Sequence, residues 1–218
     1  MPGRSPQTQA GDGATRPLLC VTVPTIPGRE SLLSRCLWSV TEQWQPGVEI
    51  LVVDGPGLLG DKINQAAQHT RAEYMTVVDD DDYLDGAYLS LILPALHDRP
   101  DFVGLKVLQW IDQQFYGIAS TRGDRDRFEH DGSNHGPTAK GVTRTDIWRR
   151  CPYGNDYKSD RAWIPEAFAH IRTHRFVDRA IYVYDHQPAV SAFVGDGSGR
   201  DIGVWPFNPL LVERITSI

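Results

Sequence analysis

Residues 72–82 read AEYMTVVDDDD, an apolar, β-favouring run that ends abruptly in four aspartates. Four neighbouring carboxylates repel one another, so a fold that gathers them at the end of a strand needs a positive group there. On an extended chain, side chains two residues apart share a face, so Asp79 pairs with Asp81 and the other two aspartates pair on the opposite face. Paired carboxylates suit a hard cation such as Mg²⁺ or Mn²⁺, and such an ion in turn suits a diphosphate.

A solvated acidic turn is the alternative interpretation of the same four aspartates. They would then only precede the next helix, for which Asp85 would be a good N-cap. The stretch by itself supports both interpretations equally, so the segments on either side of it must decide between them.

The segments around the aspartates alternate between short apolar runs and amphipathic stretches. Residues 18–23 (LLCVTV) and 49–53 (EILVV) are predicted to be buried strands of the kind found in the middle of a parallel sheet. Apolar side chains recur at helical spacing over residues 30–42, around Ile63 and again around Leu89. The resulting β-α-β-α-β-α order predicts a three-layer α/β/α sheet with right-handed crossovers.

Each of the three predicted strands ends in polar residues. Thr25 follows the first strand, Asp54 follows the second, and the four aspartates follow the third. In open α/β sheets, ligands bind at the carboxyl ends of the strands. The sequence therefore predicts a polar ligand site at this edge of the sheet.

The second half of the chain has a different pattern. Residues 102–110 and 115–120 are predicted to form two strands of a hairpin or meander, and residues 121–137 a long polar loop. A short helix with Thr145 as its N-cap and a strand at 180–184 are expected further on.

Length and composition set the remaining limits. The 218 residues are 40% apolar and 23% charged, and the formal charge of −6 argues against a broad nucleic-acid-binding surface. No apolar run reaches the length of a membrane span, and the polar start does not resemble a secretory signal. The cysteines lack metal-binding spacing, and Cys20 and Cys36 lie in apolar settings typical of buried thiols. A reducing cytoplasm is therefore the expected compartment.

Taken together, the order of these features resembles the family-2 glycosyltransferases, which are nucleotide-diphospho-sugar transferases with the GT-A fold. The similarity covers roughly residues 18–190 and rests on five short pieces. They are VTVPT at 21–25 with Arg29, ILVVD at 50–54, YMTVVDDDD at 74–82, SDR at 159–161 and YDH at 184–186. The aspartate piece is the most specific, because the family carries its Asp-x-Asp signature immediately after such a strand. The resemblance implies a Rossmann-like fold with a mixed central sheet.

The resemblance also implies how the chain is divided. Residues 1–16, rich in Gly, Pro, Gln, Thr and Ser, are predicted to be a disordered tail. Residues 17–218 would form a single domain, with a nucleotide-binding half at 17–100 and an acceptor-binding and catalytic half at 101–218.

Matching residues inherit expected roles at the donor nucleotide. Pro24, Thr25 and Arg29 would lie beside the nucleotide, and Asp54 would contact its base. Apart from the resemblance, Lys62 lies near the start of a helix, where it could meet a phosphate. The alternative, which is the commoner case for such a lysine, is simple solvation.

Other matching residues would hold a Mn²⁺ or Mg²⁺ ion against the diphosphate. Asp81 would be the principal metal ligand, and Asp79 would approach the ribose or the metal. Asp80 would belong to the same donor site, and His186 would be a further metal or diphosphate ligand from its far side.

The expected general base is Asp160. The family usually places Glu or another Asp before this residue, whereas Ser159 precedes it here, and Asp156 is the rival match. A carboxylate in this role takes the proton of the acceptor hydroxyl as the new bond forms. The resemblance favours direct displacement with inversion and no covalent intermediate.

The implied function is metal-dependent transfer of a sugar from a nucleotide diphosphate donor, with UDP as the expected nucleotide. The acceptor would be a saccharide, a small molecule or a hydroxymethylated DNA base. A nucleotidyltransferase of similar fold is one alternative, although residues 24–29 contain less glycine than the loop of that class. A catalytically silent nucleotide-sugar-binding protein is another, favoured if Asp156 and Asp160 both lay far from the aspartates.

Overall fold

The computed structural model describes residues 16–55, 57–122, 134–135, 138–155, 159–186 and 211–215. At 134–135, 159–161 and 211–215 it describes the backbone only. Almost all of the tail expected at 1–16, and most of the loop expected at 121–137, therefore lie outside the described residues.

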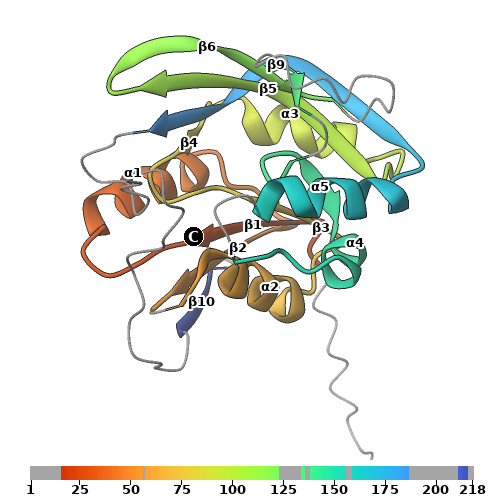
Figure 1. Ribbon diagram of the computed structural model, residues 1–218, viewed down its shortest axis with the longest axis horizontal. Coiled ribbons are helices and arrows are strands. Elements are labelled where there is room, and N and C mark those ends of the chain that lie inside the picture. Colours follow the sequence, from red (N-terminus) through yellow and green to blue (C-terminus); the bar gives the residue numbers. More distant parts are fainter. Residues whose placement is uncertain are drawn as a thin grey trace, which may run out of the picture.

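The first half of the chain has the predicted order of strands and helices (Figure 1). These elements are β1 (Leu19–Pro24), α1 (Glu30–Thr41), β2 (Val48–Asp54), α2 (Leu59–His69), β3 (Tyr74–Val77) and α3 (Tyr88–Ala95). β1 pairs in parallel with β2 on one side and with β3 on the other, so the carboxyl ends of all three meet at one edge. A two-residue strand that the sequence did not indicate, β4 (Tyr83–Leu84), precedes α3.

The second half adds the antiparallel part of the sheet. Its elements are β5 (Phe102–Ile111), β6 (Gln114–Thr121), β7 (Asn134–His135), β8 (Val142–Arg144), α4 (Thr145–Arg150), α5 (Ser159–His170), β9 (His174–His186) and β10 (Leu211–Ile215). β8 lies antiparallel between β3 and β5, and β10 lies antiparallel beside β2. β9 runs parallel to β5 on its other edge. The sheet is therefore mixed, as expected.

Some details of the second half differ from the prediction. β9 begins six residues earlier than the predicted strand, because pairing with β5 holds a polar, largely exposed stretch that has no apolar pattern. Thr145 does not cap α4: the N-cap is Arg144, and Thr145 Oγ1 donates a 2.9 Å hydrogen bond to the carbonyl oxygen of Ala72. β10 had no sequence signal beyond a weakly apolar run.

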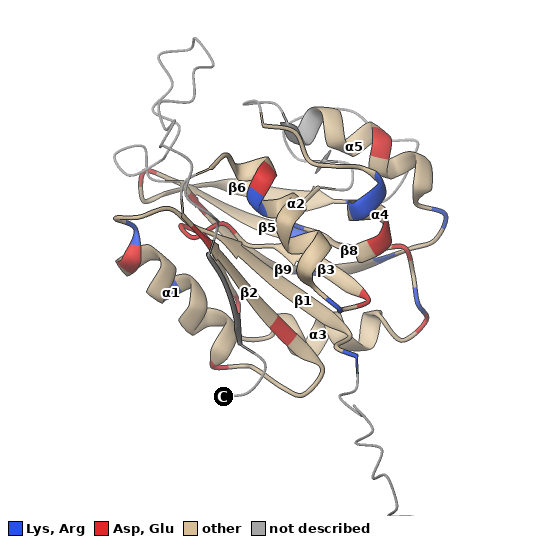
Figure 2. Ribbon diagram, turned by 90° about the horizontal axis from the view of Figure 1, so that it is seen from below, with Lys and Arg blue, Asp and Glu red and all other residues tan. Residues whose placement is uncertain are grey.

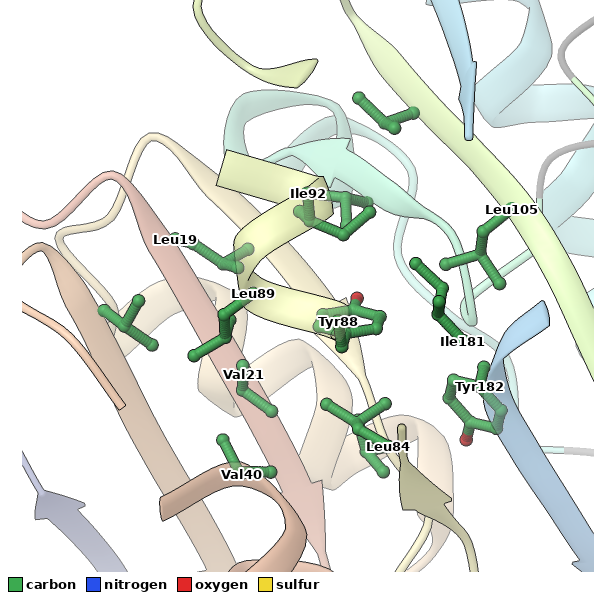
Figure 3. Packing of buried hydrophobic residues seen from close by; sticks show 14 of the residues in the cluster. Leu19, Val21, Val40, Leu84, Tyr88, Leu89, Ile92, Leu105, Ile181 and Tyr182 are labelled. Carbon is green, nitrogen blue, oxygen red and sulfur yellow. The ribbon is translucent and has the colours of Figure 1, made fainter. Parts of the chain in front are cut away.

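The core lies on both faces of the sheet, which confirms the three-layer prediction. Leu19 and Val21 of β1 pack against residues of α1 and α3, whereas Cys20 faces the cluster that contains residues of α2, α4 and α5. Figure 3 shows Leu89 and Ile92 of α3 in the first of these layers. Figure 2 shows α1 and α2 on opposite sides of the sheet.

Cys20 and Cys36 are buried, as their apolar settings predicted. All three cysteines are buried, and none of them forms a disulfide. Trp148 and Trp163 are buried and stack with ring centroids 4.2 Å apart, and Trp110 is half-buried with its ring edge-on to Phe115. Across the described ranges, no helix combines the length and apolar character needed to cross a membrane.

Candidate active site

Polar residues from three separate segments meet where the parallel strands end. β1 ends at the buried Pro24 and is followed by Thr25, β2 ends at the half-buried Asp54, and the aspartates follow β3. The fold therefore produces the polar edge that the strand ends predicted.

The four aspartates form a turn and do not continue β3 as an extended strand. The N–H of Asp82 donates a 2.9 Å hydrogen bond to the carbonyl oxygen of Asp79 and closes the turn. Asp85 is not the N-cap of α3, because Ala87 occupies that position and donates its N–H to Asp85 Oδ1. Helix capping alone thus does not account for the cluster.

The turn separates the four aspartates by their exposure. Asp80 and Asp82 are buried, with 2% and 0% of their surface exposed, whereas Asp79 and Asp81 are half-buried. These are the pairs expected from strand alternation, although a turn produces them here. Among the four, only Asp79 and Asp81 are accessible to an incoming ion or ligand.

Arg29 joins two of the aspartates through one guanidinium group. Its two Nη atoms lie 2.6 Å from Asp80 Oδ1 and 2.7 Å from Asp81 Oδ2. Thr25 Oγ1 donates a 2.7 Å hydrogen bond to the other oxygen of Asp80. Burial raises the pKa of Asp80 to about 6, and the Thr25 hydrogen bond and the Arg29 charge oppose that rise. Arg29 and Thr25 therefore lie at the predicted site, where they hold the aspartate turn.

Lys140, which the sequence reasoning missed, is a second internal cation. Its Nζ lies 2.6 Å from Asp82 Oδ2 and 3.1 Å from Asp79 Oδ2, and it donates a 3.0 Å hydrogen bond to Tyr182 Oη. Burial by itself lowers the pKa of Lys140, but the neighbouring negative charges, chiefly Asp82, outweigh it and hold the pKa well above its usual value. Burial raises the pKa of Asp82, and Lys140 opposes that rise. We infer that Lys140 and Asp82 are both charged near neutral pH.

Arg35 of α1 is the third cation of the cluster. One Nη lies 2.6 Å from Asp185 Oδ2, and the other donates to the backbone carbonyl of Asp81. Asp185 is tied to the turn because its N–H donates a 2.9 Å hydrogen bond to Asp82 Oδ1. With Asp185 counted, five carboxylates are paired with three cations, which leaves a formal charge of −2. One divalent cation would neutralise that charge.

Lys62 is buried, so the alternative of a solvated lysine is wrong. Only 2% of its surface is exposed, and Nζ donates a 2.5 Å hydrogen bond to the backbone carbonyl of Thr25. Burial lowers the pKa of Lys62, and the charges of Asp54 and Asp80 oppose this effect. Lys62 of α2 thus anchors the segment that follows β1 through this hydrogen bond to Thr25.

The side chains of the two candidate general bases are not among those that the structure describes. Asp156 lies outside it, and Asp160 lies in the first turn of α5, where only the backbone is described. His186 ends β9, and its ring stacks on Tyr184 with centroids 5.9 Å apart. Among the described side chains, no group of three or more His, Cys, Asp or Glu is placed to hold a metal ion. Among these described side chains, His186, Asp79 and Asp81 therefore do not form such a group, and the role of His186 stays a prediction.

The two accessible aspartates nevertheless suit a divalent ion chemically. One oxygen of Asp81 pairs with Arg29 and one oxygen of Asp79 pairs with Lys140, so each carboxylate has a second oxygen outside its ion pair. Mg²⁺ is commonly held by one or two carboxylates, with phosphates and water completing its shell. Two such aspartates, within a cluster of charge −2, fit a Mg²⁺ or Mn²⁺ ion that binds together with a diphosphate.

A cavity of about 310 Å³ borders the aspartate turn. Asp79 and Lys140 line it, together with residues of α2, β5, β6 and β9, whereas Thr25, Arg29 and Asp54 do not. The cavity and the segments after β1 and β2 are therefore two separate regions that meet at Asp79.

Sequence comparison identifies no relative: no protein-family model and no curated protein sequence matches the chain. Solved structures do match. TarS 1–349 from S. aureus in complex with UDP has a TM-score of 0.64 and 17% identity, over 78% of this chain and 61% of that one. The same fragment in complex with UDP-GlcNAc has a TM-score of 0.63 and 17% identity, over 77% of this chain and 58% of that one.

A second protein has a related structure. The mannosyltransferase PcManGT from Pyrobaculum calidifontis, in complex with GDP-Man and Mn²⁺, has a TM-score of 0.51 and 15% identity, over 83% of this chain and 60% of that one. The chain spans about 60% of the length of TarS 1–349. At these identities the likeness establishes the fold alone, and it confirms the glycosyltransferase GT-A fold that the sequence predicted.

Proposed function

We propose that this chain is a metal-dependent glycosyltransferase that moves a sugar from a UDP-sugar to an acceptor hydroxyl. The observation that carries the proposal is the aspartate turn at the carboxyl edge of the sheet, with two accessible carboxylates and a cluster charge of −2. The shared fold supports it, because two of the similar structures are complexes with UDP-GlcNAc and with GDP-Man and Mn²⁺.

The donor would lie along the ends of β1, β2 and β3. Pro24, Thr25 and Asp54 would contact the nucleotide, and Arg29 and Lys62 would fix the segment that surrounds it. The buried Asp80 would shape the donor site through its bonds to Thr25 and Arg29.

The diphosphate would lie at the two accessible aspartates. Asp81 would be the principal ligand of a Mn²⁺ or Mg²⁺ ion, Asp79 would be the second, and His186 would approach from the far side. When bound, such an ion neutralises the leaving diphosphate as a Lewis acid.

The transfer itself would be a direct displacement. The acceptor oxygen bonds to the anomeric carbon as the bond from that carbon to the diphosphate oxygen breaks, and the diphosphate leaves with the electron pair. Asp160, or Asp156 in its place, takes the proton of the acceptor hydroxyl, which makes a weak nucleophile competent. The configuration at the anomeric carbon would invert, because the acceptor attacks from the face opposite the leaving group.

The acceptor classes compatible with this chemistry are a saccharide, a small molecule or a hydroxymethylated DNA base. Three buried cysteines, none of them in a disulfide, support a reducing cytoplasm as the compartment.

Donor binding is testable by thermal shift and by slow donor hydrolysis. UDP-glucose, UDP-GlcNAc and GDP-mannose should raise the melting temperature with Mn²⁺ or Mg²⁺ but not with a chelator. Asp81→Asn should abolish that metal-dependent shift, whereas Asp98→Asn, which changes an exposed aspartate outside the aspartate turn, should leave it intact. No response to any of these donors with either metal would contradict the proposal.

The general base is testable with two amide substitutions. Asp160→Asn should keep donor binding and lower turnover by about 10²–10⁴-fold, the usual worth of general base catalysis. Full transfer by Asp160→Asn together with loss of transfer in Asp156→Asn would move the role to Asp156.

A further inference from the structure

The wall of the cavity beside Asp79 is part polar and part apolar. Its polar side chains come from Asp79, Gln109, Lys140, two threonines and two tyrosines. Its aliphatic side chains come from α2, β3, β5, β6 and the turn before β8, and they are Leu59, Ile63, Val77, Val107, Ala119 and Ala139. A ligand that fills this space therefore meets both carbon and hydrogen-bonding groups.

The two charged groups of the wall are paired with each other. Lys140 Nζ lies 3.1 Å from Asp79 Oδ2, and it also donates hydrogen bonds to oxygens of Asp82 and Tyr182. An ammonium group has three N–H donors, so none of them is left for an anionic ligand. Because the charges of Lys140 and Asp79 cancel, the wall favours a neutral ligand.

Two other polar groups of the wall are available to such a ligand. The side-chain amide of Gln109 and the hydroxyl group of Tyr184 have no hydrogen-bond partner among the described residues. Both side chains are half-buried. Thr121 differs, because its Oγ1 is bonded to both backbone groups of Leu105. The amide and the phenol are therefore groups that a neutral ligand can bind.

The register of the sheet places these two groups side by side. Gln109 of β5 is paired with Tyr184 of β9 on one side and with Gly117 of β6 on the other. Paired residues of neighbouring strands project from the same face of a sheet. Gly117 has no side chain, and a Cβ there would meet nothing within 4 Å. The Gln109 amide thus has the phenol on one side and open space on the other.

This combination of groups matches a sugar ring. A carboxamide and a phenol each contain a donor and an acceptor, as does every hydroxyl group of a sugar. A pyranose also has C–H groups on its faces, which suit the aliphatic side chains of the wall. A fully apolar ligand would leave the amide and the phenol without partners, which costs free energy. The volume of about 310 Å³ is at the lower end of the range for ligand pockets, about 300–1,000 Å³, and suits a single ring.

We infer that the cavity binds one pyranose ring and that Gln109, together with Tyr184, hydrogen-bonds the hydroxyl groups of this ring. Gln109 is then a specificity-determining residue. This inference rests on the proposed glycosyltransferase function and adds the residues that select the sugar. The ring belongs either to the donor or to an acceptor saccharide, because Asp79 joins the cavity to the place where the diphosphate would lie.

Three substitutions test the two groups. Gln109→Leu removes the amide and keeps a side chain of similar size. Tyr184→Phe removes only the hydroxyl group and keeps the ring, which contacts Lys140 and His186. Gln114→Leu is the matched control, because Gln114 is an exposed residue of β6 and does not line the cavity.

Ligand-observed NMR with glucose, N-acetylglucosamine and mannose measures binding to the cavity directly. At least one of these sugars should bind the parent protein and Gln114→Leu equally. Gln109→Leu and Tyr184→Phe should each weaken that binding about tenfold, the usual effect of leaving a hydroxyl group of the ligand without its partner. If one of the two variants does not fold, the other decides. No binding of any of the three sugars to the parent, or full binding to Gln109→Leu, would overturn the inference.

Competition identifies the source of the ring. The nucleotide sugar that carries the same sugar should displace the free sugar if the cavity holds the donor's ring. The free sugar should stay bound beside the nucleotide sugar if the cavity holds the acceptor's ring. The nucleoside diphosphate alone, with Mn²⁺, should displace nothing in either case. Displacement by the diphosphate alone would overturn the inference, because the cavity would then be part of the nucleotide site.

The same measurements separate this inference from the proposed function. If no nucleotide sugar binds the parent protein, the proposed function fails. Binding of the free sugars to the parent and its loss in Gln109→Leu would still show that the cavity is a sugar site. Conversely, if Gln109→Leu binds the nucleotide sugar and the free sugar as well as the parent does, the proposed function stands and the inference fails.

Discussion

Replacing Lys140 with methionine would remove one of the cations that neutralise the buried aspartates. Methionine is of similar length and apolar, so the substitution changes charge more than packing. Asp82, whose side chain is 1% exposed, would keep its hydrogen bonds from Tyr182 Oη and from the Asp185 N–H. Among its described contacts, however, it would have no cation.

The expected cost is large and depends on pH. Removing one partner of a buried ion pair costs about 3–5 kcal/mol. Burial already raises the pKa of Asp82 with Lys140 beside it, and the loss of Lys140 would raise that pKa further. A carboxyl group whose pKa is raised in the folded state stabilises the fold fully at a pH below its unfolded pKa. That stabilisation is lost as the pH rises through the folded pKa. The deficit should therefore be largest near about pH 8 and smaller near about pH 5.

Urea unfolding of the parent and the variant at both pH values measures this cost. Lys106→Met is the matched control, because Lys106 pairs at the surface with Asp178, which is 69% exposed, and should change the free energy of unfolding by no more than about 0.5 kcal/mol. Asp82→Asn in the Lys140→Met background should recover part of the loss. A cost below about 1 kcal/mol near pH 8, or one that does not shrink near pH 5, would refute the reasoning.

Backbone geometry gives two more predictions. Asp112 and Gln113, the two-residue turn between β5 and β6, have φ of 51° and 62°, so Asp112→Asn with Gln113→Gly should raise the free energy of unfolding by about 0.5–1 kcal/mol. An unchanged or lower denaturation midpoint would contradict this. A Cβ at Gly104 would lie 1.9 Å from the Thr121 carbonyl oxygen, so Gly104→Ala should cost about 1–3 kcal/mol, whereas Gly117→Ala, where a Cβ meets nothing within 4 Å, should not suffer that clash. Equal unfolding midpoints for the two alanine variants would count against the clash.

Sequence periodicity was enough to predict the order of the helices and of the parallel strands in the first half. Strands such as β1 and β2 are nearly continuous apolar runs, and the helical spacing of buried residues such as Ile63 and Ala67 is visible directly. The polar residues after each strand also revealed the edge at which Thr25, Asp54 and the aspartates meet. These signals are local, and local patterns are what a sequence displays.

The features that the sequence did not reveal depend on distant partners. Lys140 belongs to no motif, and its role comes from Asp79 and Asp82, which lie 61 and 58 residues away in the chain. The burial of Lys62 was not visible in the sequence, because the carbonyl that it contacts belongs to Thr25, 37 residues earlier. β10 is a strand because the edge of β2 is available to it.

The environments of the lysines have a consequence for chemical labelling. Acylating reagents modify an amine only when it is accessible and not protonated. Lys106 lies at the surface with 32% of its side chain exposed, so it should be acylated in the folded protein. Lys62 and Lys140, whose ammonium groups are hydrogen-bonded within the fold, should be protected until their surroundings open. Mass spectrometry would measure acylation at each lysine separately. Acylation of Lys62 would report opening of the segment after β1, and acylation of Lys140 would report opening of the aspartate turn.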